Sequence, residues 1–372
     1  MRIAVIGAGI GGLTAACGLA ADGHEVIAYE RRDEPGAVGA GLTLFGNAFG
    51  ALDAIGLGDT VREVSSDAIA RMRAGQRVPS GDWLVSMSSA MVPMLRSLHR
   101  AELHRALADA LPAGTLRVGH GATVASDGQP IVTVDGVEER FDLVVAADGL
   151  RSDARARLGL DRGLRYAGYT AWRGVTADGI NVQDEAGETW GRGRIFGIVP
   201  LPDERVYWFA TESTVADLHA EDERAAVRER FSDWHTPIPA CIDATPAEAV
   251  LRHDIYDLDG LPAAFAKGRT VLLGDAAHGM TPNLGQGAGQ AIEDAATLTI
   301  LLRTGDPDTA LARYDRLRRK RTTAIWRQSR QLGKIAQASH PVAAELRDAL
   351  LRATPPALMG RATQRIQRWT KP

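Results

Sequence analysis

Three glycines near the start of the chain, Gly7, Gly9 and Gly12, constrain the fold more than any other feature. They directly follow the apolar run Ile3 to Ile6. This spacing is typical of a buried parallel strand that turns into a helix. The first glycine permits the turn, the second lets a pyrophosphate approach the backbone, and the third lets the helix pack on the strand. The spacing therefore predicts a Rossmann-like βαβ unit that binds a dinucleotide at a helix N-terminus.

An acid at the end of the second strand narrows the choice of dinucleotide. Glu30 lies 18 residues beyond Gly12, close to the usual distance in this motif. A carboxylate there accepts hydrogen bonds from both ribose hydroxyls and repels a 2′-phosphate. NADP is therefore disfavoured, which leaves NAD or FAD. We expect Glu30 and its neighbour Arg31 to bind the cofactor.

A second glycine-rich segment, near residue 280, indicates FAD. Gly274 and Asp275 follow the apolar run 270–273, which predicts a strand. Asp275 would then lie at the end of that strand and face a ligand that is bound across the βαβ unit. The segment 281–289 then begins a helix whose first amides lack intrahelical partners. Such a helix end stabilises negative charge on a reduced flavin. The residues expected beside the flavin are Gly285, Gln286, Gly287 and Ala288.

The middle of the chain has a different pattern. Residues 166 to about 253 carry much of the Trp and Tyr, and alternating segments such as Arg194–Val199 and Arg205–Ala210 predict an antiparallel sheet. The predicted fold is α/β: an FAD-binding Rossmann-like βαβ domain with an interleaved antiparallel-sheet substrate domain and C-terminal helices. The expected divisions are an FAD-binding domain of residues 1–70, 96–165 and 263–335, a substrate-binding sheet domain of 71–95 and 166–262, and a helical tail of 336–372.

Composition excludes several other classes of protein. The net charge is −3, without the basic excess of a nucleic-acid binder, and the basic run 316–321 is expected to form the solvent-exposed face of a helix. Cys17 and Cys241 match neither a zinc spacing nor a disulfide framework, so we predict no metal site and a reducing, cytoplasmic location. No apolar run reaches the roughly 18 to 20 residues of a membrane span.

Three motifs in this order resemble the class A, single-component FAD-dependent monooxygenases with the para-hydroxybenzoate hydroxylase fold. They are the Gly7 to Gly12 fingerprint with Glu30, the segment 147–155 around Asp148-Gly149, and Gly274-Asp275 with its glycine-rich helix start. The resemblance extends to about residue 335. It implies further cofactor contacts at Gly41, Thr43, Arg100, Val124 and Asp148, the last also serving NAD(P)H.

The resemblance also implies a reaction. NADH or NADPH reduces FAD, O2 adds to form a flavin C4a-hydroperoxide, and one oxygen is transferred to an electron-rich aromatic or heteroaromatic ring. Because the cofactor carries the chemistry, neither a metal cluster nor a catalytic triad is required. The expected partners are a small aromatic substrate and O2, with the protein a monomer or homodimer.

The substrate end is most similar to the urate hydroxylases and to salicylate- and hydroxybenzoate-type hydroxylases, particularly at 169–175. In the urate enzymes, residues matching Arg194 and Tyr207 face the substrate. These enzymes carry an acid after a Thr-Pro pair, whereas this chain has Pro282-Asn283, and an amide cannot act as a general base. A substrate that needs no enzymic base, or that uses Tyr207 or a histidine, is therefore favoured over urate. The candidate catalytic residues are Arg194, Tyr207, Pro282 and Asn283.

Other functions remain open from the sequence. An NAD-dependent dehydrogenase would need the first fingerprint without Gly274-Asp275. Flavin halogenases and geranylgeranyl-type reductases share the FAD fold, although the Trp-x-Trp-x-Ile-Pro segment usual in halogenases is absent from this sequence. Epoxidation, Baeyer–Villiger-type oxygen insertion and a flavin-binding module without turnover also remain as alternatives.

Overall fold

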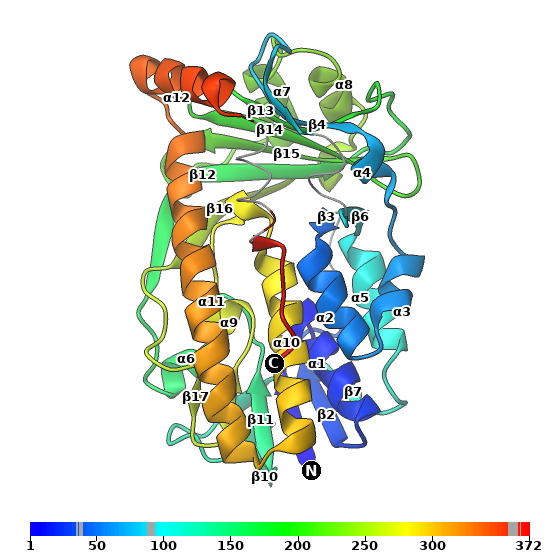
Figure 1. The fold of residues 1–372 in the computed structure, drawn as a ribbon, viewed down its shortest axis with the longest axis vertical. Coiled ribbons are helices and arrows are strands. Elements are labelled where there is room, and N and C mark those ends of the chain that lie inside the picture. Colours follow the sequence, from blue (N-terminus) through cyan, green and yellow to red (C-terminus); the bar gives the residue numbers. More distant parts are fainter. Residues whose placement is uncertain (35, 37–39, 88–93, 356–363, 365) are drawn as a thin grey trace.

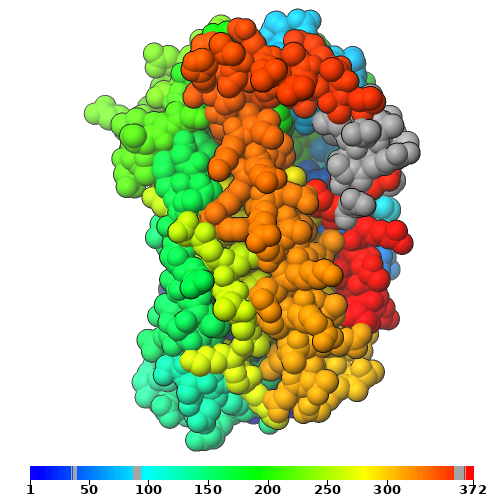
Figure 2. Space-filling model, turned by 60° about the vertical axis from the view of Figure 1, so that its left-hand side comes forward, coloured from blue at the N-terminus to red at the C-terminus, as the bar shows by residue number. Residues whose placement is uncertain are grey.

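Two β-sheet units are stacked end to end (Figure 1). The computed structural model describes residues 1–34, 36, 40–87, 94–355, 364 and 366–372. The lower unit in Figure 1 is built on a mostly parallel sheet and contains the N-terminus, and the upper unit is built on a mostly antiparallel sheet. Helix α11 (Pro307–Ala336) runs along both units, as Figure 2 also shows.

The lower sheet has the strand order β17-β18-β11-β1-β2-β7. Its parallel strands are β1 (Arg2–Ile6), β2 (Glu25–Glu30), β7 (Leu116–Val118), β11 (Leu143–Ala146) and β18 (Thr270–Leu272), and β17 (Ala266–Lys267) pairs antiparallel at the edge. The central strands are nearly continuous runs of buried apolar residues, as expected for a parallel sheet covered on both faces. The predicted βαβ unit is therefore present.

Helices and a small sheet complete the core of the lower unit. Helices α1 (Ile10–Ala21) and α10 (Gly287–Thr304) pack against each other. The same core includes residues of a β10-β9-β8 sheet and of α6 (Asp153–Arg157). The strands of that sheet are β8 (Ala122–Val124), β9 (Ile131–Val134) and β10 (Val137–Arg140). A second apolar cluster joins α1 and α10 to α2 (Gly46–Ala54), α3 (Gly58–Glu63), α5 (Arg100–Asp109), β3 (Gly41–Leu44) and β6 (Arg96–His99).

The upper sheet has the order β16-β12-β15-β14-β13-β4-β5. Its strands are β4 (Arg73–Arg77), β5 (Trp83–Met87), β12 (Leu164–Val175), β13 (Glu185–Trp190), β14 (Arg194–Pro200), β15 (Val206–Ser213) and β16 (Leu251–Leu258). The pairing is antiparallel except between β13 and β4, which are parallel. Strand β4 belongs to an earlier segment of the chain that enters the upper unit separately from β12 to β16. The sheet is thus mixed at this point.

One face of the upper sheet is covered by short helices. Trp172, Phe196 and Trp208 form an apolar cluster there with Phe231 and Ile238. The helices are α7 (Glu223–Arg230), α8 (Ile238–Asp243) and the 3-10 turn η2 (Ala247–Ala249), while α4 (Ala68–Arg71) and α12 (Pro341–Ala353) lie at the edges of the unit. The opposite face therefore remains available to the lower unit.

Part of the basic run on α11 is buried, so the prediction of a solvent-exposed face at 316–321 is wrong there. Arg318 is only 2% exposed and forms ion pairs with Glu293 and Asp294 of α10. Asp294 also binds His278. These charges satisfy one another inside the core, as buried ions must, and they hold α11 against α10.

No helix in the described ranges combines the length and the apolar character that crossing a membrane requires.

Candidate active site

A cavity of about 500 Å³ lies between the two units. The lower unit lines it with the starts of α1, α5 and α10, with β3, and with the chain leaving β11 and β18. The upper unit lines it with the face of the sheet that α7 and α8 leave uncovered. Both units are therefore needed to form it.

The first glycine fingerprint forms one end of this cavity wall. Gly7 has a φ of +97°, and a Cβ there would lie 2.5 Å from the carbonyl oxygen of Ala147. A Cβ on Gly12 would overlap the carbonyl oxygen of Gly7. Gly9 differs, because it lines the cavity and its Cβ position has no atom within 4 Å. Of the three glycines, only Gly9 has free space at its Cβ position. Gly9 is also the glycine at which the motif brings a pyrophosphate close to the backbone.

Glu30 lies directly beside this glycine turn. Its Oε2 accepts a hydrogen bond from the Ala8 N–H at 3.0 Å, and its Oε1 accepts one from the Arg32 N–H at 3.0 Å. The carboxylate is therefore fixed at the end of β2. Arg31 is exposed next to it.

The second glycine segment brings another helix N-terminus to the cavity. A Cβ on Gly11 would lie 2.9 Å from Cβ of Ala291, so the starts of α1 and α10 touch. Gly285, with a left-handed φ of +61°, allows the sharp turn from η3 (Pro282–Leu284) into α10. Gly287 and Ala288 line the cavity, and no atom lies within 4 Å of a Cβ on Gly287. Two helix N-termini therefore face one open space, which fits an anionic dinucleotide.

Gln286 does not face the cavity, contrary to the sequence prediction. It is 2% exposed, and its Oε1 accepts hydrogen bonds from Asn47 Nδ2 at 3.0 Å and from Gln290 Nε2 at 3.1 Å. At the first turn of α10, the helical rotation points this side chain towards α2. Gln286 therefore joins two helices.

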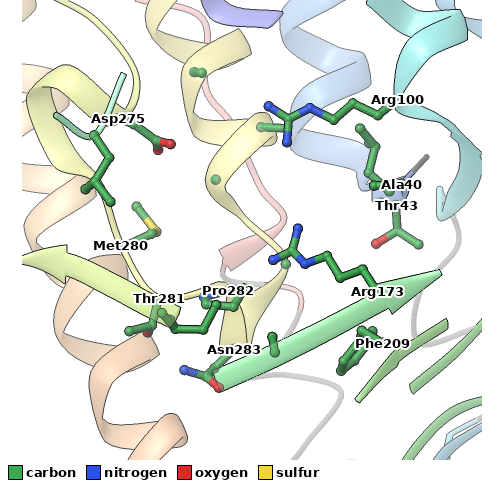
Figure 3. Close-up of a pocket in the computed structure, with 18 of the residues that line it drawn as sticks. Ala40, Thr43, Arg100, Arg173, Phe209, Asp275, Met280, Thr281, Pro282 and Asn283 are labelled. Atoms are coloured by element: carbon green, nitrogen blue, oxygen red, sulfur yellow. The ribbon is translucent and has the colours of Figure 1, made fainter. Parts of the chain in front are cut away.

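Charged side chains from three separate elements point into the cavity (Figure 3). Arg100 begins α5, Asp275 begins α9 (Asp275–His278) and Arg173 lies on β12. Burial lowers the pKa of Arg100, the charge of Asp275 opposes that effect, and the nearby positive charge of Arg173 adds to it. Neither arginine forms an ion pair within 4 Å in the part of the chain that the structure describes. Two partly desolvated cations beside one acid are well placed to bind anionic groups.

Besides Gln286, further predicted cofactor residues lie outside the cavity lining: Gly7, Glu30, Arg31, Val124 and Asp148. Asp148 accepts a hydrogen bond from the Ala154 N–H in the first turn of α6 at 3.0 Å, and its buried Oδ1 has no partner among the described residues. Val124 is 3% exposed in the core of the lower unit. The cavity is instead lined here by the neighbours of Asp148, which are Ala147, Gly149 and Leu150.

The upper sheet presents a row of side chains to the cavity. In the strand register, Glu188 of β13 pairs with Gly197 of β14, Gly197 with Phe209 of β15, and Phe209 with Arg173 of β12. Glu188, Phe209 and Arg173 all line the cavity. Because side chains alternate between the faces of a sheet, residues one position away from this row point towards α7 and α8.

Arg194 belongs to the other face, so the structure contradicts its predicted contact with substrate. It pairs in register with Glu212 and forms an ion pair with that residue at 2.8 Å. It also donates a hydrogen bond to the carbonyl of Arg230 in α7 at 3.2 Å. Arg194 is three residues before Gly197 on β14. Because side chains alternate between the two faces of a strand, Arg194 lies on the face that α7 and α8 cover, opposite to the cavity.

Tyr207 lies in the cavity wall where the two units meet. A Cβ on Gly41 would lie 2.5 Å from Cβ of Tyr207, so only glycine lets β3 approach this ring. Burial raises the pKa of Tyr207, and the charges of Arg173 and Arg100 oppose the shift. Thr43 lines the cavity from the same strand as Gly41.

Pro282 and Asn283 line the cavity, but the amide of Asn283 is occupied. Its Nδ2 donates to Tyr169 Oη at 3.0 Å and to the carbonyl of Ser329 at 3.3 Å. Burial raises the pKa of Tyr169, which therefore stays protonated. Asn283 is thus a residue that positions η3 against β12 and α11.

Arg173 and Glu188 are cavity residues that the sequence analysis does not identify. The sequence feature that could have identified them is the alternation of side chains along a strand. Tyr169, Ala171 and Arg173 share one face of β12, and Glu188 shares a face with Trp190 on β13. Within the described ranges, no group of three or more His, Cys, Asp or Glu side chains has the arrangement of a metal site.

The chain is similar to known proteins over most of its length. A sequence profile described as an FAD binding domain matches residues 1–329. The aurachin C monooxygenase/isomerase of Stigmatella aurantiaca is 38% identical, covering 95% of this chain and 94% of that protein. The 2-heptyl-3-hydroxy-4(1H)-quinolone synthase of Pseudomonas aeruginosa is 32% identical, covering 98% and 97%.

Solved structures show the same fold. The Klebsiella pneumoniae protein HpxO, in complex with FAD and uric acid, superposes with a TM-score of 0.89 at 29% identity, covering 99% of this chain and 96% of that one. The predicted fold class and the predicted FAD cofactor are thereby confirmed.

Proposed function

Because the chain belongs to the FAD binding domain family and is an FAD-dependent monooxygenase, we propose that it hydroxylates a 4(1H)-quinolone ring that carries an alkyl substituent. The observation that carries this proposal is the character of the substrate side of the cavity. It is a largely apolar chamber, with the cation of Arg173 and the carboxyl of Glu188 at opposite sides of the sheet that forms its floor.

The apolar part of the chamber favours a substrate with a hydrocarbon portion. Its walls are formed by Trp190, Ile195, Val199, Phe209, Leu332 and Ala336. Each buried CH2 group contributes about 0.8 kcal/mol to binding. A small polar ring such as urate would leave these walls uncovered, whereas an alkyl chain would cover them.

The names of two relatives support the same substrate class. The relatives with 38% and 32% identity over nearly the whole chain are named for aurachin C and for a 2-heptyl-3-hydroxy-4(1H)-quinolone. A urate hydroxylase is also 33% identical, but over 85% of this chain. These identities and coverages favour an alkyl quinolone over urate as the substrate.

The missing base at Asn283 is consistent with a quinolone. A 4-quinolone is a vinylogous amide, so the ring nitrogen donates electrons to C3 without prior removal of a phenolic proton. The amide of Asn283, occupied by Tyr169 and Ser329, is then sufficient. Arg173 would donate hydrogen bonds to the ring oxygen and hold the ring in position while C3, supplied with electrons by the ring nitrogen, forms the new bond to oxygen.

Bound FAD supplies the activation of O2 with electrons from a reduced nicotinamide. The first amides of α1 and α10 would hold the phosphates and stabilise negative charge on the flavin. Glu30 and Asp275 would accept hydrogen bonds from ribose and ribityl hydroxyls. The apolar walls would exclude water from the reacting atoms.

We also propose the finer features that the sequence predicts. The protein acts in the cytoplasm with NADH or NADPH and O2, as a monomer or homodimer. The division into residues 1–70, 96–165 and 263–335 for FAD and 71–95 and 166–262 for substrate is supported by which sheet each segment enters.

The test is a substrate comparison with purified, FAD-loaded enzyme. We expect 2-heptyl-4(1H)-quinolone to stimulate NADH or NADPH consumption and to yield a product heavier by one oxygen atom. Urate, salicylate and 6-hydroxynicotinate are the alternative substrates. Turnover of urate but not of the quinolone would contradict the proposal.

A further inference from the structure

We propose that Glu188 accepts a hydrogen bond from the ring N–H of the substrate and thereby selects heteroaromatic rings that carry such a donor opposite their ring oxygen. This inference rests on the proposed function, which supplies a ring with both groups. It assigns a specificity role to a residue that none of the sequence motifs contains.

The geometry of the sheet places Glu188 and Arg173 at opposite sides of one floor. They are the ends of the register row Glu188, Gly197, Phe209 and Arg173. Three strand spacings separate them, about 14 Å between backbones. A hydrogen bond of about 3 Å at each end leaves room for a flat ring with polar atoms on opposite edges.

The floor between them is flat and apolar. A Cβ on Gly197 would fall on the ring of Phe209, so that ring lies across the glycine towards β13. Any larger residue at Gly197 would lift the ring into the cavity. An aromatic substrate resting on Phe209 would therefore present one edge to Arg173 and the other to Glu188.

The carboxyl of Glu188 lacks a compensating charge. It accepts a hydrogen bond from Trp190 Nε1 at 2.7 Å, and no cation lies within 4 Å of it among the residues described. Burial raises the pKa of Glu188, and the bond from Trp190 only partly opposes the shift. A buried carboxyl with spare acceptor capacity facing a cavity costs stability. A substrate N–H would satisfy it.

The same hydrogen bond would favour the reaction. A carboxyl oxygen that accepts from the ring N–H increases electron donation from nitrogen to C3 and stabilises the positive charge that develops on nitrogen as C3 forms the new C–O bond. Arg173 holds the ring oxygen. No proton needs to leave the nitrogen during binding. Glu188 would thus act on the nitrogen from which the electrons move, and Arg173 would orient the ring.

The variant Glu188→Gln tests this role, because glutamine keeps the shape and can still accept the bond from Trp190. Its amide N–H groups, however, would face the substrate N–H. The two probes are 2-heptyl-4(1H)-quinolone and its N-methyl analogue, titrated against FAD-loaded enzyme by tryptophan fluorescence. For the N–H compound we expect Kd and KM to rise about 10- to 100-fold, with a smaller effect on kcat. For the N-methyl compound we expect Kd to change less than threefold.

Thermal unfolding separates this role from a structural one. Since the carboxyl costs stability where it is, Glu188→Gln should melt at the same or a higher temperature than the wild type. Glu345→Gln is the matched control, because Glu345 is exposed on α12; it should change neither Kd nor KM.

The outcomes are distinguishable. If the wild type does not bind the N–H quinolone, both the proposed function and this inference are overturned. If the wild type hydroxylates it and Glu188→Gln binds it equally well, only the inference is overturned. An equal loss for both probes, or a lower melting temperature, would show that Glu188 serves the fold.

Discussion

The side-chain amide of Asn283 donates a hydrogen bond to the phenol oxygen of Tyr169 at 3.0 Å and so joins the two units at the cavity. Asn283 lies in η3, directly before the glycine turn that leads into α10 of the lower unit, and Tyr169 lies on β12 of the upper sheet. The position where the sequence resemblance implies an acid is thus used here to fix one sheet unit relative to the other.

The first prediction concerns this bond. Asn283→Ala should lower the free energy of unfolding by about 1–2 kcal/mol, because it removes hydrogen bonds to Tyr169 and Ser329. Tyr169→Phe should cost a similar amount. The double variant should cost less than the sum, because both substitutions remove the same bond. Urea unfolding measures all three, and strict additivity would show that the bond does not contribute.

The second prediction separates two glycines of the fingerprint. Gly12→Ala should lower the melting temperature of the protein without FAD, because the new Cβ overlaps the carbonyl of Gly7. Gly9→Ala should leave that temperature within about one degree, since its Cβ position is open, yet weaken FAD binding at least about tenfold by obstructing the pyrophosphate. Thermal unfolding and FAD fluorescence titration give the two readouts. Equal FAD affinity in Gly9→Ala and wild type would contradict the assignment.

The third prediction compares two strand arginines. Arg173→Ala should lower kcat/KM for the quinolone about 10- to 100-fold, because a charged hydrogen-bond donor to the ring oxygen is lost. Arg173→Lys should recover only part of this, since lysine lacks the planar fork. Arg194→Ala should change kcat/KM by less than about threefold, because its partly exposed ion pair with Glu212 faces away from the cavity. Steady-state kinetics decides, and the reverse ranking would favour the sequence-based assignment of Arg194.

The fourth prediction is a pH dependence of stability. Burial works against ionisation of Asp294, yet the charges of His278 and Arg318 hold its pKa below the ordinary value of 3.8. A lowered pKa gives stability that is present above the unfolded-state value and lost as pH falls through the folded-state value. Asp294→Asn should therefore destabilise by about 3–5 kcal/mol at pH 7, and the difference from wild type should shrink below about pH 4.

Urea unfolding at pH 7, 5 and 3.5 measures this difference. Asp59→Asn is the control, because Asp59 is almost fully exposed in its pair with Arg62; it should show little difference at any of these pH values. A constant deficit of Asp294→Asn across the three pH values would show that its packing, and not its charge, matters.

Much of the fold follows from local patterns in the sequence. Gly7, Gly9 and Gly12 act through backbone geometry over a few residues, so their spacing alone predicts the strand, turn and helix that the structure contains. The same holds for Gly274 and Gly285, where a positive φ is required. These features could be predicted because their causes lie within one turn of chain.

The errors in the sequence analysis have a common cause. Arg194 and Arg173 are both strand arginines, and only the pairing of β14 with β15 and of β15 with β12 shows which of them faces the cavity. The sequence predicts Gln286 beside the flavin and Arg318 on a solvent-exposed face. Their partners, Asn47 of α2 and Glu293 of α10, lie 239 and 25 residues away in the chain, and helical periodicity does not encode such contacts.

The sequence by itself determined the dinucleotide fold and the FAD cofactor, because glycine spacing and strand-end acids act locally on backbone and ligand. Only the tertiary structure decided what surrounds the substrate. The register of the upper sheet aligns Glu188, Phe209 and Arg173, which lie on three different strands. The physical reason is that side chains alternate along every strand, but which of the two sets faces the cavity is decided only when the strands pair and one face of the sheet is buried.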